Sequence, residues 1–169
     1  MIKQQRPYGL WPSPVSATMI GQSVRLGEAQ WDSDGRTLVW LEGRSDRGVL
    51  TAQNGSEARR DLTDEQSVRG GIGYGGGEFH VRDGVLVFAE RGGRLFRRSL
   101  GYGGARPITP PFGAAAAPAI SPDGRWVMYV YSDGQTDLLG LVDAEGRDWP
   151  LQLARGADFY MQPTWHPDG

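Results

Sequence analysis

Short apolar runs alternate with polar turns along the chain, and no window sustains an apolar period of 3.6 residues. Asp-Gly pairs stand at 34–35, 83–84, 123–124 and 168–169, and the first three are followed by apolar runs. Asp-Gly between apolar runs is a strong hairpin signal because glycine takes positive φ without steric cost. The pattern predicts antiparallel strands near 38–42, 49–53, 79–82, 85–90, 95–100, 126–131 and 137–142, and one helical turn near 16–21.

The spacing of the hairpin signals indicates a repeat. The Asp-Gly pairs are 49, 40 and 45 residues apart, and a period in the forties is the length of a propeller blade. A short fourth strand is expected in each period, at 60–63, 106–109 and 149–153. The sequence therefore predicts an all-β fold, a partial β-propeller of about three four-stranded antiparallel blades plus the start of a fourth. The expected blades cover about 24–66, 74–111 and 114–156, and the start of blade four covers 159–169.

The last hairpin signal has no second strand after it. Closed propellers have about 4–8 blades. We therefore expect this chain to be a fragment of a larger propeller.

Composition narrows the function classes. The 169 residues include no cysteine, which excludes disulfide scaffolds, cysteine-ligated zinc and thiol catalysis. A net charge near −2 gives no electrostatic case for nucleic acid or an anionic membrane as partner. No apolar run approaches the roughly 20 residues of a membrane helix, and prolines at 7, 12 and 14 interrupt the opening segment. We expect a cytoplasmic protein.

Three groups of residues resemble cofactor or metal sites by letter. Residues 71–76 match G-x-G-x-x-G, but a strand pattern follows where a dinucleotide site needs a helix, so we interpret them as an inter-blade connection or a loop at the channel mouth. His80 and His166 have no metal-ligand spacing, and a packed repeat position is the better reading of His80. Asp32 and Asp34 fit turn residues better than a calcium loop. No cofactor or metal site is expected.

Two charged groups remain as candidates for contacts. Arg91, Arg94, Arg97 and Arg98 form a basic cluster, which we interpret as a solvated surface, with contact to another domain or to a peptide carboxylate as the alternative. Glu42 and Arg44 are either channel or interdomain residues or simple turn residues.

Several segments, in order along the chain, resemble bacterial prolyl oligopeptidase family serine peptidases, often labelled dipeptidyl aminopeptidase or acylaminoacyl-peptidase. The opening Pro-Tyr-Gly-Leu-Trp-Pro-Ser-Pro-Val-Ser-Ala at 7–17 and the Tyr-Gly-Gly-Gly-Glu-Phe run at 74–79 carry the resemblance most sharply. Segments 39–44, 68–69 and 94–97 extend it. The Ser-Pro-Asp-Gly repeat alone is less specific, because Tol-type periplasmic propellers share it.

The resemblance implies an N-terminal propeller that limits the entry of short peptides to a C-terminal α/β-hydrolase domain with a Ser-Asp-His triad. The sequence contains no G-x-S-x-G nucleophile elbow, so no catalytic residue is carried over and the hydrolase domain is expected to be absent from this chain. The expected partners are that domain, the remaining blades and short peptides. The candidate channel or interdomain contacts are Glu42, Arg44, Tyr74, Arg94 and Arg97.

Two alternatives from other classes stay open. One is a non-catalytic binding or scaffold module, a propeller completed by self-association. The other is a sugar-active propeller lyase, which the sequence supports poorly because it lacks a histidine cluster for metal. A continuation of the reading frame that contains G-x-S-x-G, then Asp and His, separates the peptidase from the scaffold.

Overall fold

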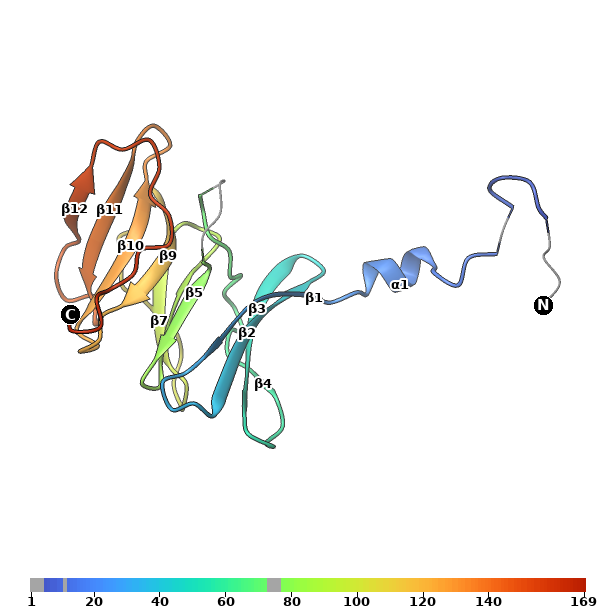
Figure 1. Ribbon diagram of the computed structural model, residues 1–169, viewed down its shortest axis with the longest axis horizontal. Helices are drawn as coiled ribbons and strands as arrows, with labels where there is room; N and C mark the ends of the chain where they lie inside the picture. The colour runs from blue at the N-terminus through green and yellow to red at the C-terminus, as the bar shows by residue number, and fades with distance from the viewer. Residues whose placement is uncertain (1–4, 11, 73–76) are drawn as a thin grey trace.

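A computed structural model describes residues 5–10, 12–72 and 77–169. Three four-stranded antiparallel sheets are stacked side by side, and in each the strands follow one another in chain order (Figure 1). The all-β partial propeller is therefore confirmed. The elements are α1 (Ala17–Gly21); β1 (Arg25–Trp31), β2 (Thr37–Arg44), β3 (Arg47–Asn54) and β4 (Arg60–Asp61); β5 (Phe79–Arg82), β6 (Val85–Ala89), β7 (Leu95–Ser99) and β8 (Arg106–Pro107); and β9 (Ala114–Ile120), β10 (Trp126–Ser132), β11 (Asp137–Asp143) and β12 (Leu151–Arg155).

The seven predicted strands and the helical turn are all present. The outer strands β4 and β8 are shorter than the sequence indicates, and β12 begins at Leu151 rather than at 149. The first strand of each sheet, β1, β5 or β9, is called its inner strand. β1 and β9 were not among the seven predicted ranges, and each pairs with the strand that follows it. We call the three sheets blade one, blade two and blade three in chain order.

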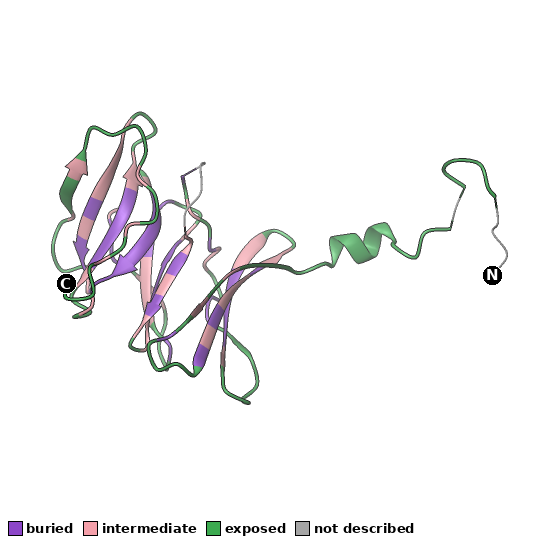
Figure 2. Ribbon diagram, viewed as in Figure 1, coloured by how far each residue is buried: buried purple, intermediate pink, exposed green. Residues whose placement is uncertain are grey.

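The blades are held together by two apolar layers, one between each pair of neighbours. Side chains alternate across a strand, so Val39 on β2 and Leu50 on β3 face blade two, where Phe79 and Phe88 meet them. The second layer lies between blades two and three and includes Val87 and Val127. Figure 2 shows the buried residues concentrated in these strands.

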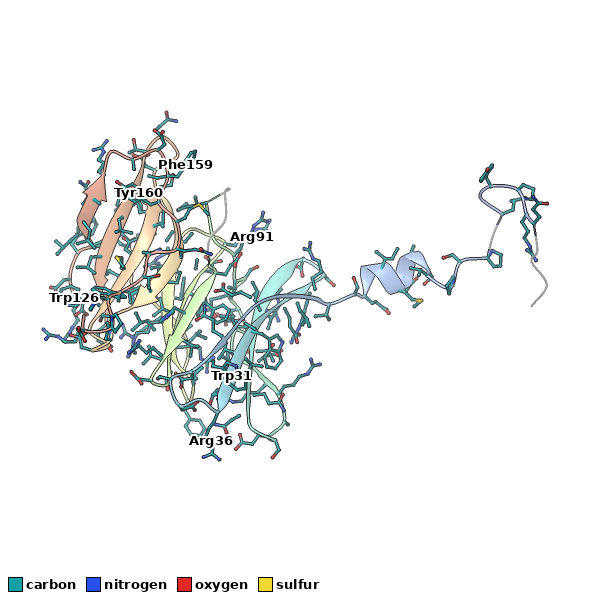
Figure 3. The ribbon with its side chains drawn as sticks, viewed as in Figure 1. Trp31, Arg36, Arg91, Trp126, Phe159 and Tyr160 are labelled. Carbon is teal, nitrogen blue, oxygen red and sulfur yellow. The ribbon has the colours of Figure 1, made fainter. Side chains whose placement is uncertain are left out.

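Blade three has no further sheet against its far face in the described part of the chain. The tail after β12 crosses this face instead, and Tyr160 packs against Ala116, Ala117 and Val130 (Figure 3). The described tail forms no strand. Its assignment to a fourth blade stays a prediction.

The Asp-Gly hairpins are of two kinds. Asp83 and Gly84, with φ of 50° and 73°, form a two-residue turn between β5 and β6. In blade one the loop is longer, and the Asp34 carboxylate accepts the backbone N–H groups of Arg36 and Thr37 at 2.7 and 2.8 Å. These bonds hold the pKa of the Asp34 carboxyl below its ordinary value. The turn role expected for this aspartate is confirmed.

The blade-one hairpin is also hydrogen-bonded to the blade-two hairpin. The Asp32 carboxylate, almost fully buried, accepts the backbone N–H of Gly84 at 3.0 Å. The Ser33 hydroxyl accepts the backbone N–H of Asp83 at 2.7 Å. Asp32 also accepts the backbone N–H of Ser33 at 2.8 Å, so the turn role that the sequence indicates is present, and the contact between blades adds to it.

The N-terminal arm lies away from the blades (Figure 1). It carries α1, and its large apolar side chains are exposed; they include Tyr8, Leu10, Met19 and Ile20. Ser16 caps α1 by accepting the Met19 N–H at 3.1 Å. Among the described residues, none of the helices has the length and apolar character to cross a membrane.

We predict that Asp32→Ala lowers the free energy of unfolding by about 1–3 kcal/mol, because it leaves the Gly84 N–H without its partner between the blades. Urea denaturation measures the change. Asp46→Ala, at an exposed turn position, is the matched control and should leave the midpoint unchanged. Equal midpoints for the two variants would show that the contact contributes nothing.

Candidate functional site

Antiparallel connectivity brings the turns that follow each second strand to one end of the stack. The β2–β3, β6–β7 and β10–β11 turns share this end with the β4–β5 and β8–β9 connections. We call it the upper end, because it points upward in Figure 1. Arg44 closes β2 at this end, and Arg94 immediately precedes β7. Tyr74 and most of the G-x-G-x-x-G run lie outside the described residues.

Glu42 and Arg44 belong to one charged network on blade one. The Glu42 side chain is 2% exposed, and its carboxylate accepts from Trp40 Nε1 at 2.9 Å and from Arg44 Nε at 2.8 Å. Arg59 adds a third donor at 3.1 Å. Arg44 continues to Asp61 with two bonds of 2.6 and 2.8 Å. Both candidates are therefore engaged inside their own blade, and their contact with a channel ligand or another domain stays a prediction.

Electrostatics fix the protonation state of this network. Burial by itself raises the pKa of the Glu42 carboxyl, but the hydrogen bonds from Trp40 and Arg44 and the nearby guanidinium charges outweigh it. The net pKa lies below the ordinary value, so Glu42 is ionised at neutral pH. The bonds from Arg44 lower the pKa of Asp61 in the same way.

Two arginines of the predicted basic cluster hold neighbouring blades. The Arg97 guanidinium pairs with Glu145 of blade three at 2.7 Å, and Arg106 binds the same carboxylate. On the other side, Arg98 donates to the Leu62 carbonyl of blade one. The interpretation of these side chains as a solvated surface is wrong for Arg97 and Arg98, because the adjacent blade supplies acceptors that the sequence pattern does not reveal.

The other two arginines of the cluster lie at the upper end. Arg94 donates to the Thr109 carbonyl at 2.8 Å, and its guanidinium lies 5.9 Å from the centre of the Phe96 ring. Arg91 is exposed, as Figure 3 shows. It lines an upper hollow of 790 Å³ between blade one and the β4–β5 connection. The arginines around this hollow are Arg25, Arg44, Arg47, Arg69 and Arg91, against the acidic Asp46 and Glu78.

A second hollow, of 600 Å³, opens along the inner strands β1, β5 and β9 and the tail. We call it the inner hollow, since these are the strands that line the central channel of a propeller. Gln30 on β1 donates to the Phe79 carbonyl at 2.8 Å, and His80 Nδ1 on β5 accepts the Ile120 N–H at 3.2 Å. Trp165 donates from Nε1 to the Ala119 carbonyl at 2.8 Å. Inner-strand side chains therefore link neighbouring blades while they line the hollow.

His80 serves this contact as a neutral imidazole. Burial lowers the pKa of His80, and the positive charge of Arg82 lowers it further. A neutral ring can accept a backbone N–H at Nδ1, which fits its bond to Ile120. Among the described residues, no group of three His, Cys, Asp or Glu side chains that could hold a metal ion occurs.

Sequence reasoning missed Gln30, Glu28 and Trp165. The Glu28 carboxylate accepts the Glu78 N–H at 3.0 Å, and this bond holds the connection that leads into β5 against blade one. Neither Glu28 nor Gln30 belongs to a motif. Trp165 could have been found from the repeat. It stands three residues before an Asp-Gly pair, as do Trp31 and Ile120, the last residues of β1 and β9.

We predict that Glu42→Gln destabilises the fold by about 1–3 kcal/mol at pH 7, because it removes the charge that Arg44 and Arg59 bind. A lowered folded-state pKa contributes stability above the ordinary value of 4.5, and that contribution is lost as the pH falls below it. The difference between wild type and variant should therefore shrink from pH 6 towards pH 3 in urea denaturation. Glu57→Gln, at an exposed position, is the control. A difference independent of pH would contradict the assignment.

The chain matches no family model. The curated Tol-Pal system protein TolB of Actinobacillus pleuropneumoniae, strains L20 and JL03, is 29% identical over 96 residues, which cover 55% of this chain and 22% of that protein. The solved TolB of Acinetobacter baumannii superposes with a TM-score of 0.58 and 17% identity over 77% of this chain and 33% of that chain, which shows the shared fold.

A solved puromycin-hydrolysing peptidase of Mycobacterium tuberculosis superposes over 95% of this chain, with a TM-score of 0.80 and 25% identity. The chain spans only 29% of that peptidase and 22% of the curated relatives. The resemblance to the N-terminal propeller of prolyl oligopeptidase family peptidases is therefore confirmed at the level of structure.

Proposed function

We propose that this chain is the N-terminal part of a peptidase propeller that limits the entry of short peptides to a hydrolase domain supplied by the rest of the protein. The observation that carries the proposal is the match to the puromycin-hydrolysing peptidase over 95% of this chain. The remaining blades and the hydrolase domain are the partners in this proposal. The cytoplasm is the proposed compartment, and cell fractionation tests it.

The two hollows support a role in peptide passage. The inner hollow runs along the strands that line a propeller channel, and the upper hollow lies at the end from which the β2–β3 turn projects. Arg44 is already paired with Glu42 and Asp61, and the other four arginines against two acids make the upper hollow basic. Its positive charge attracts a peptide carboxylate or an acidic surface of a neighbouring domain.

The N-terminal arm supports the presence of a further partner. Tyr8 is fully exposed, and Leu10, Met19 and Ile20 are more than half exposed. Apolar side chains gathered on one detached segment mark an interaction site. In this proposal the arm packs against the domain that the present chain lacks.

The first test compares the 169-residue chain with the product of the continued reading frame. The isolated chain should not turn over aminoacyl or dipeptidyl amides, because it contains no nucleophile elbow. The longer product should hydrolyse them and react with a fluorophosphonate probe at one serine. A continuation without G-x-S-x-G, or a longer product that the probe does not label, would refute the peptidase assignment.

The second test concerns the upper hollow in the longer product. Arg91→Glu should lower kcat/KM severalfold for peptides with a free carboxylate and leave the C-terminal amides unchanged, since the variant places an acid in the upper hollow. Arg36→Glu, at the exposed lower end in Figure 3, is the matched control. Equal effects on both peptide classes would contradict a role in carboxylate recognition.

The scaffold alternative is favoured by a different observation, the exposed apolar side chains of blade one. Leu26 is 74% exposed and Trp31 is 62% exposed, and both lie on β1. If self-association completes the propeller, sedimentation at micromolar concentration should show a species larger than the monomer. A monomer with one cooperative thermal transition would contradict this alternative.

A further inference from the structure

A small pocket between blades two and three is separate from both hollows. It has a volume of 170 Å³ and is lined mainly by rings and short side chains. The aromatic residues are Phe112, Tyr129, Tyr131 and Trp149. We call it the aromatic pocket.

Phe112 makes ring contacts with two other aromatic residues of the pocket. Phe112 lies edge-on to Tyr131 with 6.5 Å between ring centres, and 5.7 Å from the ring centre of Trp149. Both distances fall in the range of favourable aromatic pairs. Phe112 and Trp149 are each more than half exposed, so an incoming ring can meet their faces.

The lining carries no charge. None of the described residues around the aromatic pocket is Asp, Glu, Lys, Arg or His. The pocket therefore offers no opposite charge to a carboxylate or a phosphate, and a neutral ligand fits it better. Its size is close to that of an apolar cavity of about 150 Å³ that holds one benzene ring.

One polar group within the aromatic pocket lacks a partner. Tyr129 is 3% exposed, and its hydroxyl makes no hydrogen bond with any described residue. Gly140 stands opposite it on β11, and a Cβ added there would lie 2.9 Å from the Tyr129 ring, so the ring lies directly over the glycine. Burial raises the pKa of Tyr129 to about 12, with a contribution from Tyr131, so the hydroxyl stays protonated. The hydroxyl oxygen is not one of the fully buried unpaired atoms of the described residues, so it stays reachable and can bond to a ligand in the pocket.

We propose that the aromatic pocket binds one neutral phenol-class ring, with its hydroxyl hydrogen-bonded to Tyr129. This inference goes beyond the proposed function and does not depend on it, because the pocket is complete within blades two and three and their connection. A phenol ring occurs both in free small molecules and in tyrosine side chains of peptides. The pocket fits the ring in either source.

Titration of the 169-residue chain with p-cresol, followed by amide NMR, tests the proposal. We expect saturable shifts at Gly93 and Gly140, with a dissociation constant on the order of 1 mM for so small a ligand. N-acetyltyrosine amide distinguishes the sources: binding of both probes supports a tyrosine side chain, and binding of p-cresol alone supports a free phenol. Absence of saturable shifts with both probes would overturn the proposal.

Two variants test the hydrogen bond and the ring contacts separately. Tyr129→Phe should weaken p-cresol binding roughly three- to tenfold while leaving toluene binding unchanged, because only the hydroxyl is removed. Trp149→Ala should weaken both ligands, and Trp31→Ala, at a similarly exposed position on blade one, is the control. If Tyr129→Phe binds p-cresol as wild type does, or if Trp149→Ala behaves as the control does, the assignment fails.

Discussion

Burial of the two blade interfaces is the constraint on which the rest of this structure depends. A single four-stranded sheet buries too little apolar surface to be stable by itself, and each blade here gains its core from the neighbour it faces. Val39 and Leu50 share one buried cluster with Phe79 and Phe88 of the next blade. The upper hollow, the inner hollow and the aromatic pocket are spaces left around these packed faces.

Polar contacts set the register in which the faces meet. Apolar contacts are non-directional. They fix the distance between two blades, but they do little to stop one blade from sliding along the face of the other. Asp32 and Gln30 bind backbone groups of blade two at defined positions, and Arg97 binds Glu145 of blade three. Gln30 also lines the inner hollow, so a variant at this position changes the stability of the blade interface and the shape of the hollow together.

The fold was predictable because its signals are local. Asp83-Gly84 forms the two-residue turn that its residue types favour, and Asp34 accepts the turn amides of its own loop. The contacts between blades were not predictable in this way. The Asp32 bond reaches across 52 residues, and its existence depends on how two hairpins lie side by side after packing. Arg98 likewise finds its acceptor on another blade, so a count of neighbouring charges in the sequence misjudges it. The aromatic pocket had no sequence signal, because Phe112 and Trp149 meet only through the packing of two connections.

The side-chain contacts of β1 and β5 run in one direction along the chain, whereas Trp165 of the tail binds back to the backbone of blade three. Glu28, Gln30 and Asp32 of blade one all bind the backbone of blade two, and His80 of blade two binds the backbone of blade three. A chain made on the ribosome releases its N-terminal part first. The side chains that make these contacts are therefore synthesised before the backbone that they bind. Because each blade gains its core from the next one, these bonds can form only as the later blade packs, and packing and register are fixed together.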